Sequence, residues 1–160
     1  PEFLARLQRI LNTAGLRVHI ENPYQLKTKG EMLLGCANQK LLRAEAATST
    51  SCGRFQRFKY THCGRCVPCQ VRRAAFLAWG VPDTTPYVYE HLGRDDANHA
   101  GFDDVRSVAM AIAQVREDGL DDWIGPALSS SLIGDVASLK TLVQRGLDEL
   151  NALHQTYGVR

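Results

Sequence analysis

Residues 51–70 read SCGRFQRFKYTHCGRCVPCQ and contain four of the five cysteines of this 160-residue chain. Cys52, Cys63, Cys66 and Cys69 follow the spacing Cys-x10-Cys-x2-Cys-x2-Cys. A Cys-x2-Cys turn brings two sulfurs to one metal ion, and Gly64 permits the positive φ that such a knuckle often needs. Four thiolates close a tetrahedral zinc site and leave no open position for water. The spacing therefore predicts a structural zinc ion, and no catalytic residue is assigned.

Two other interpretations of these cysteines stay open at the level of spacing. They could be reduced thiols that only pack together, or ligands of an iron–sulfur cluster. The run from Cys63 to Cys69 resembles the first three ligands of a ferredoxin motif, but the Cys-Pro completion is missing. His62 is expected to be a surface imidazole, and Cys36 a buried thiol outside the cluster. Zinc remains the favoured ion for the four sulfur ligands.

The composition bounds the class of protein. Hydrophobic residues make up 44% and charged residues 22% of the chain, which is typical of a globular domain. The formal net charge of +2 gives no overall argument for a nucleic-acid or membrane partner. No apolar run approaches the roughly 20 residues that span a bilayer. An odd number of clustered cysteines fits metal binding in a reducing compartment, so a cytoplasmic location is expected.

The hydrophobic periodicity is mostly helical. Helices are expected over residues 3–11, 28–34, 38–46, 71–79, 102–115 and 135–157. Thr28 and Glu31 form a capping-box pattern, and Gly80 is placed to end a helix. Residues 16–20 alternate apolar with polar side chains, which predicts a short strand. The expected fold class is mainly α, with a structural zinc knuckle and one or two short strands.

Several motifs together resemble a known family. Thr28-Lys29 with Glu31 matches a Thr-Lys-x-Glu helix start, and Thr50-Ser51-Cys52 matches a Thr-Trp-Ser-Cys segment that here lacks the Trp. The Cys-Gly-x-Cys-x2-Cys knuckle is followed by Arg72, Phe76, Gly80 to Asp83, Thr85 and Tyr87. These residues resemble the C-terminal part of 7-cyano-7-deazaguanine synthases, the QueC-like branch of the PP-loop ATP-pyrophosphatases. The resemblance covers roughly residues 3 to 90.

The resemblance implies the end of a PP-loop α/β protein of the adenine nucleotide α-hydrolase-like type, over residues 1–90, with the zinc knuckle at 52–69. A helical C-terminal extension is expected over residues 91–160. The family's members are ATP-dependent ligases that act on 7-deazaguanine substrates in queuosine biosynthesis. Their Ser-Gly-Gly-x-Asp-Ser nucleotide loop does not occur in these 160 residues. ATP and Mg²⁺ are thus expected only in a full-length protein, and no activity is expected of this chain alone.

The departures from the family pattern point to a divergent branch. The first cysteine gap is ten residues instead of about eight, and Gly53 stands where an aromatic residue is usual. In this respect the chain is similar to the QueC-like proteins of Qat anti-phage defence systems. The expected partners are the N-terminal PP-loop region of the same protein, a second copy of the chain, or other defence proteins. No membrane partner is expected.

Three cations are candidate ligand-binding residues: Lys29 at a helix start, and Arg65 and Arg72 near the knuckle. Arg65, Arg72 and Arg73 are expected to extend a basic surface from the loop between Cys52 and Cys63. That loop interleaves bases with aromatic residues, a composition that can stack on nucleobases and neutralise phosphate. The competing interpretation is that Phe55 and Phe58 pack on the zinc site. A nucleic-acid-binding zinc-knuckle module and a helical protein-interaction domain are the alternative functions.

Overall fold

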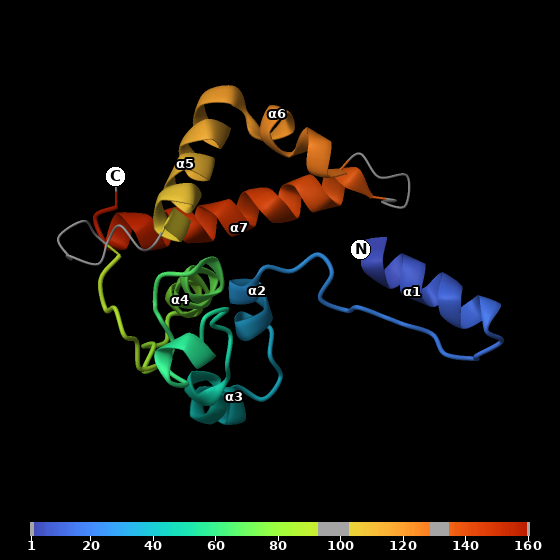
Figure 1. Cartoon of the computed structure of the whole chain (residues 1–160), viewed down its shortest axis with the longest axis horizontal. Coiled ribbons are helices and arrows are strands. Elements are labelled where there is room, and N and C mark those ends of the chain that lie inside the picture. The colour runs from blue at the N-terminus through green and yellow to red at the C-terminus, as the bar shows by residue number, and fades with distance from the viewer. Residues whose placement is uncertain (1, 93–102, 129–134, 160) are drawn as a thin grey trace.

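The computed structural model describes residues 2–92, 103–128 and 135–159 (Figure 1). In these ranges the regular elements are helices and short 3-10 turns, and no strand is present. They are α1 (Glu2–Thr13), α2 (Lys29–Leu34), α3 (Gln39–Glu45), η1 (Ala46–Thr48), η2 (Gln56–Phe58), α4 (Val67–Trp79), α5 (Asp103–Asp118), α6 (Leu120–Ile124), η4 (Gly125–Leu128) and α7 (Val136–Thr156). The expectation of a mainly helical chain is confirmed.

Helix α4 is central because it is buried on nearly every side. One face carries Ala74, which packs in a cluster with Leu92, Val105 and Leu153 from segments far along the chain. Another face carries Phe76 and Trp79, which cluster with Ala46. Small alanines let neighbouring helices approach closely, while the aromatic rings fill the wider gap. Helix α4 thereby joins the knuckle to both halves of the core.

The long helix α7 packs across α4 and is covered on its other side by α5 and α6 (Figure 1). Its apolar stripe, expected from the sequence, is buried at Leu139, Leu147 and Leu153. Val105 and Val108 supply the matching face of α5. The C-terminal helices therefore share a core with the knuckle-bearing part of the chain.

Local capping signals fixed most helix ends. Thr28 accepts a hydrogen bond from the N–H of Glu31, whose carboxylate accepts one from the N–H of Thr28, so the predicted capping box is confirmed. The side chains of Asn38 and Asp135 cap α3 and α7 by accepting from the N–H groups of Leu41 and Ser138. Gly80 ends α4 at a φ of 71°, a left-handed conformation that glycine adopts at little cost. Helix α4 begins four residues earlier than expected, inside the cysteine motif.

The predicted strand at residues 16–20 is wrong. This segment is an exposed, extended connection that leads away from α1, and Leu16 and Val18 are each more than half exposed. The Gln8 side chain supplies its hydrogen bonds, donating to the carbonyl of Val18 and accepting from the N–H of Ile20, both at 2.8 Å. A strand requires a neighbouring strand, and no described residue provides one here. Alternation alone could not reveal that absence.

No helix within the described ranges has the length and hydropathy needed to cross a membrane.

Candidate metal centre

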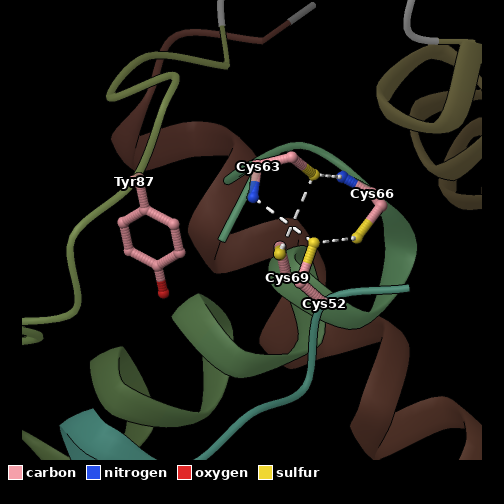
Figure 2. Close-up of a cluster of buried hydrophobic side chains, with 5 residues drawn as sticks. All are labelled: Cys52, Cys63, Cys66, Cys69 and Tyr87. Carbon is pink, nitrogen blue, oxygen red and sulfur yellow. Dashed lines mark hydrogen bonds between the residues drawn. The ribbon is translucent and has the colours of Figure 1, made fainter. Parts of the chain in front are cut away.

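The four cysteines of the knuckle converge from one loop and one helix start (Figure 2). Cys52 precedes the turn η2, Cys63 ends the loop, Cys66 is the N-cap of α4 and Cys69 lies in its first turn. Their exposed fractions are 7%, 0%, 3% and 0%. Pro68 suits the first turn of α4, where a backbone N–H would lack a helical partner. The helix therefore starts where two of the sulfurs are needed.

The spacing of the sulfurs fits one tetrahedral ion. All four Sγ atoms lie within 4.8 Å of one another. The distances are 3.9 Å from Cys63 to Cys69 and 3.9 Å from Cys66 to Cys52. Four sulfurs at about 2.3 Å from one zinc ion are about 3.8 Å apart, whereas a disulfide bond measures about 2.05 Å. The cluster therefore has the dimensions of a metal site.

Backbone amides surround the sulfurs. Cys52 Sγ accepts from the N–H groups of Arg54 at 3.4 Å and Cys63 at 3.3 Å, and Cys63 Sγ accepts from the N–H of Cys66 at 3.3 Å. Hydrogen bonds of this kind stabilise thiolate over thiol. The loop is built to hold anionic sulfur.

The thiols also interact strongly with one another. Hydrogen bonds from the Cys66 and Cys69 thiols lower the pKa of Cys63, and the bond to Cys63 raises the pKa of Cys66 to about 11. The pKa of Cys69 is raised for the same reason, helped by burial. Four thiolates this close repel one another unless a cation lies among them. Metal binding requires deprotonated sulfur, so this donor set fits a divalent cation such as zinc.

Gly64 is required by a close approach of the chain. Its φ is 86°, and a Cβ there would lie 2.4 Å from the carbonyl oxygen of Tyr89 and 3.2 Å from Tyr87 Cβ. The segment around Val88 runs beside the knuckle, with Val88 N–H donating to the carbonyl of His62 at 2.9 Å. Tyr89 N–H donates to the carbonyl of Cys63 at 3.2 Å. The knuckle is thus closed by residues about 25 positions later.

His62 is buried, so the expectation of a surface imidazole is wrong. Only 4% of the residue is exposed, and its ring makes edge contacts with Phe55 and Tyr87. Its Nε2 accepts a hydrogen bond from the N–H of Ser51 at 3.3 Å. Burial, followed by the nearby charge of Arg72, lowers the pKa of His62 and favours the neutral ring. Cys36, expected to be buried, is only half-buried.

Comparison with known proteins assigns this chain to a family. The sequence model of one family, described as queuosine biosynthesis protein QueC, matches residues 1–80. The chain belongs to the QueC family. It is 38% identical over 90 residues to the 7-cyano-7-deazaguanine synthase of Methanocaldococcus jannaschii, covering 54% of this chain and 39% of that protein.

Other relatives carry the same name. The 7-cyano-7-deazaguanine synthase of Cupriavidus metallidurans is 33% identical over 93 residues, covering 54% of this chain and 39% of the relative. That of Methanococcus maripaludis is 36% identical over 93 residues, covering 56% and 40%. The chain therefore spans about two-fifths of the length of the curated QueC relatives that it matches. No solved structure matches it.

Arg72, which lies in a QueC-like motif, is buried and bound by protein atoms. Its Nε and Nη2 donate to Thr85 Oγ1 at 3.1 and 2.9 Å, and its Nη1 donates to the carbonyl and hydroxyl of Ser49 at 3.0 and 2.9 Å. Nη2 also donates to the carbonyl of Ala46. The guanidinium joins the end of α3 to the segment after α4. This set of contacts describes a structural arginine.

Arg65 and Arg73 are buried too, so the expected continuous basic surface does not form. Arg65 is 1% exposed, donates from Nε to the carbonyl of His91 at 2.8 Å and lies 4.7 Å from the ring centre of Tyr89. Arg73 lies between Tyr87 and Tyr157, 4.7 and 4.4 Å from their ring centres. Sequence alone could not distinguish these arginines from exposed ones, because their partners come from distant segments.

Lys29 is exposed at the start of α2, whereas the two arginines are buried. It borders a groove of about 310 Å³ between α2, α4 and α7. The three cations predicted as ligand-binding residues thus do not share one pocket among the described residues. Lys29 alone of the three keeps an exposed position from which to meet a ligand.

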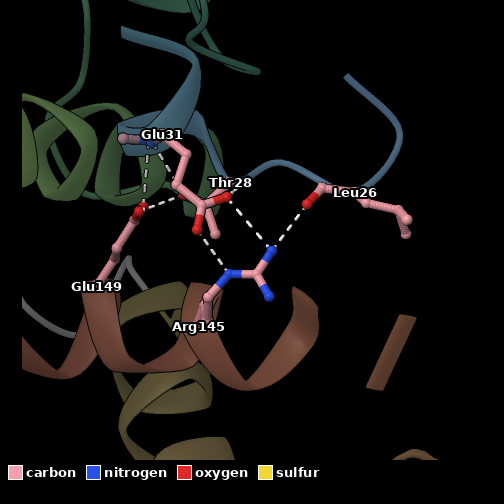
Figure 3. Close-up of polar contacts among 6 residues, drawn as sticks. Leu26, Thr28, Glu31, Arg145 and Glu149 are labelled. Carbon is pink, nitrogen blue, oxygen red and sulfur yellow. Dashed lines mark hydrogen bonds and ion pairs between the residues drawn. The ribbon is translucent and has the colours of Figure 1, made fainter. Parts of the chain in front are cut away.

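Sequence reasoning missed two charged residues of α7 that contact the start of α2 (Figure 3). Glu149 accepts hydrogen bonds from Thr28 Oγ1 and, at 3.4 Å, from the N–H of Gly30. Arg145 donates from Nε to Glu31 at 2.6 Å and from Nη2 to the carbonyl of Leu26 at 2.8 Å. The contact with Arg145 and the hydrogen bond from Thr28 N–H lower the pKa of Glu31. No signal in the sequence paired these residues, which lie more than 110 positions apart.

Proposed function

We propose that this chain is the zinc-stabilised C-terminal region of a QueC-like ATP-dependent ligase that acts on 7-deazaguanine substrates. The observation that carries the proposal is a buried four-sulfur cluster of metal-site dimensions in a chain whose residues 1–80 match the QueC family. Four thiolates fill the coordination sphere of zinc, so the ion would hold the loop onto α4 and would not activate water. The ligase chemistry then belongs to a nucleotide-binding region outside these residues.

The surface of the N-terminal part supports such a partner region. Helix α1 has no buried residue, and Figure 1 shows it lying apart from the remaining helices. Phe3 is 74% and Ile10 64% exposed, and Leu16 and Val18 follow on the connecting segment. Exposed apolar residues in this number indicate a covered surface in the complete assembly. We propose that the PP-loop region of the ligase covers this surface and that ATP and Mg²⁺ bind to the PP-loop region.

Reconstitution tests the proposal. The chain is combined with a QueC PP-loop region, and ATP consumption that depends on 7-carboxy-7-deazaguanine is followed. We expect turnover only when both parts are present, and we expect Ile10→Asp to weaken their association because a charge would be buried at the contact. Asn12→Asp is the matched control on α1, because Asn12 is exposed on another face and aspartate keeps the oxygen that accepts from Gln8. ATP-dependent turnover by the 160-residue chain alone would refute this division of labour.

We further propose that this chain belongs to a QueC-like protein of anti-phage defence and that its natural acceptor differs from free ammonia. The helical region from α5 to α7 lies beyond the family match at residues 1–80, and it supports this proposal because α7 contacts Thr28 and Glu31 of the Thr-Lys-x-Glu helix start. Phage plaque counts on cells with the native operon, or with its Cys66→Ser form, test it. Equal plating efficiency would contradict a defence role.

The division into residues 1–90 and 91–160 and a cytoplasmic location are part of the same proposal. Limited proteolysis of the zinc-loaded chain would locate the boundary, and cell fractionation would locate the protein.

A further inference from the structure

The loop between Cys52 and Cys63 carries the exposed positive charge of the knuckle. Residues 46–82 contain six Lys and Arg and no Asp or Glu. Arg65, Arg72 and Arg73 are buried, and Arg54 is ion-paired with Asp104 at 3.1 Å. Arg57 and Lys59 are exposed. These two cations therefore account for the positive surface of the loop.

Next to Lys59 the loop displays an aromatic ring, that of Tyr60. Tyr60 is 71% exposed, although the loop that carries it packs on a buried cluster. Phe55 contacts one side of the ring edge to face, with centres 5.9 Å apart, and Phe55 in turn contacts His62 at 5.2 Å. Phe55 and Phe58 pack against the cysteine cluster, as the sequence suggested. The Tyr60 ring is thus exposed to solvent while one side of it contacts Phe55, which packs on the cysteine cluster.

The backbone of the loop is held in an unfavourable conformation that produces this display. Lys59 and Tyr60 have φ of 52° and 61°, and neither is glycine. A left-handed residue with a Cβ costs roughly 1–2 kcal/mol, and such conformations cluster at functional sites. Hydrogen bonds hold the turn, including Tyr60 N–H to the carbonyl of Phe55 at 2.9 Å and Thr61 N–H to Phe58 at 3.1 Å. The chain keeps a tyrosine here although asparagine or glycine would relieve the strain.

We propose that Tyr60, Arg57 and Lys59 form a binding surface for single-stranded nucleic acid. The ring would stack on an unpaired base, and the two cations would neutralise the adjoining phosphates. Stacking is open to every base, so the surface would show little sequence preference. A duplex is disfavoured because its bases are already stacked. This inference is independent of the ligase proposal, since the surface lies on the outer side of the knuckle loop.

Fluorescence anisotropy with a labelled twelve-residue oligothymidylate tests the proposal on the whole zinc-loaded chain. We expect binding at low salt that weakens about sevenfold between 50 and 200 mM, from two phosphate contacts on a single strand. Tyr60→Asn should weaken binding at least about fivefold, because it removes the stack while tolerating the left-handed backbone. The double variant Arg57→Gln and Lys59→Asn should remove most of the salt dependence.

The matched control is Tyr24→Asn. Tyr24 is 50% exposed and has Lys27 Nζ 5.9 Å from its ring centre, so it offers similar groups in another loop. We expect no change in binding for this variant, and one zinc per chain in every variant. Undiminished binding by Tyr60→Asn, or equal binding of a duplex of the same length, would overturn the proposal. Absence of binding to oligothymidylate at low salt would overturn it as well.

Discussion

Gly30 occupies the tightest helix contact at the start of α2, and its replacement by alanine is a sensitive test of how α7 is docked. A Cβ at this position would lie 2.5 Å from Glu149 Oε1 and 2.7 Å from Ala78 Cβ. Glu149 can rotate away, but it then loses its hydrogen bonds to Thr28 Oγ1 and Gly30 N–H. Ala78 belongs to α4, so relieving that overlap requires α2 and α4 to separate.

The size of the effect follows from three contributions. Alanine gains about 1 kcal/mol over glycine in a helix. Overpacking costs about 1–3 kcal/mol, and a lost hydrogen bond to a charged group costs about 1.5–3 kcal/mol. We expect Gly30→Ala to lower the free energy of unfolding by about 3 kcal/mol, which is roughly 6–12 °C in Tm for a chain of this size.

Gly146→Ala on α7 is the matched control. A Cβ at Gly146 meets no atom within 4 Å, so only the helix preference changes, and we expect a gain of about 0.5–1 kcal/mol. Urea unfolding of the zinc-loaded proteins, followed by circular dichroism, measures both. Adding Ala78→Gly to Gly30→Ala should recover part of the loss. If both alanine variants are stabilised equally, α7 does not lie against α2 as described.

Other perturbations test the metal and the buried polar groups. Cys66→Ser should lose the one bound zinc per chain, and hydrogen exchange should show residues 50–80 unfolded. Cys36→Ser should keep its zinc and its protection from exchange. A folded, metal-free Cys66→Ser protein would contradict the structural role. A double-mutant cycle on Arg145 and Glu31 should give a coupling of about 0.5–1 kcal/mol that falls in high salt, since both side chains are about one-third exposed. Burial lowers the pKa of His154, so the unfolded chain takes up the proton first, and stability should fall as pH drops below the ordinary histidine pKa of about 6.5. Substitution by Gln should flatten that slope in pH-dependent urea unfolding, and an unchanged slope would argue against a buried neutral ring.

The parts of the fold that could be predicted are those determined by neighbours in sequence. The cysteine spacing lies within eighteen residues, so the cluster formed by Cys52 and its three partners followed from turn geometry alone. The capping box at Thr28 and the glycine stop at Gly80 are equally local. For the capping box and the glycine stop the partner atoms are only a few positions away, and for the cysteines they are at most seventeen positions away, so these rules need little tertiary information.

Long-range contacts determined what could not be predicted. Arg72 and Arg73 looked like a basic surface because their carbonyl and hydroxyl acceptors come from other segments. The strand predicted at residues 16–20 had the right alternation, but a strand depends on a partner that the described chain does not supply. Glu149 gave no sign of its contact with Thr28, because only the folded arrangement of α7 brings the two together.

The guanidinium of Arg73 sets an order of events for a chain emerging from the ribosome. It donates to the carbonyls of Gly64 and Glu90 and to the hydroxyl of Tyr157, so its full set of acceptors exists only once the last helix has been made. The four sulfurs, by contrast, are all translated by residue 69. Metal loading can therefore precede completion of the Arg73 contacts by nearly ninety residues of synthesis. A nascent chain halted before Tyr157 would have all four sulfurs in place but would lack the hydroxyl acceptor of Arg73.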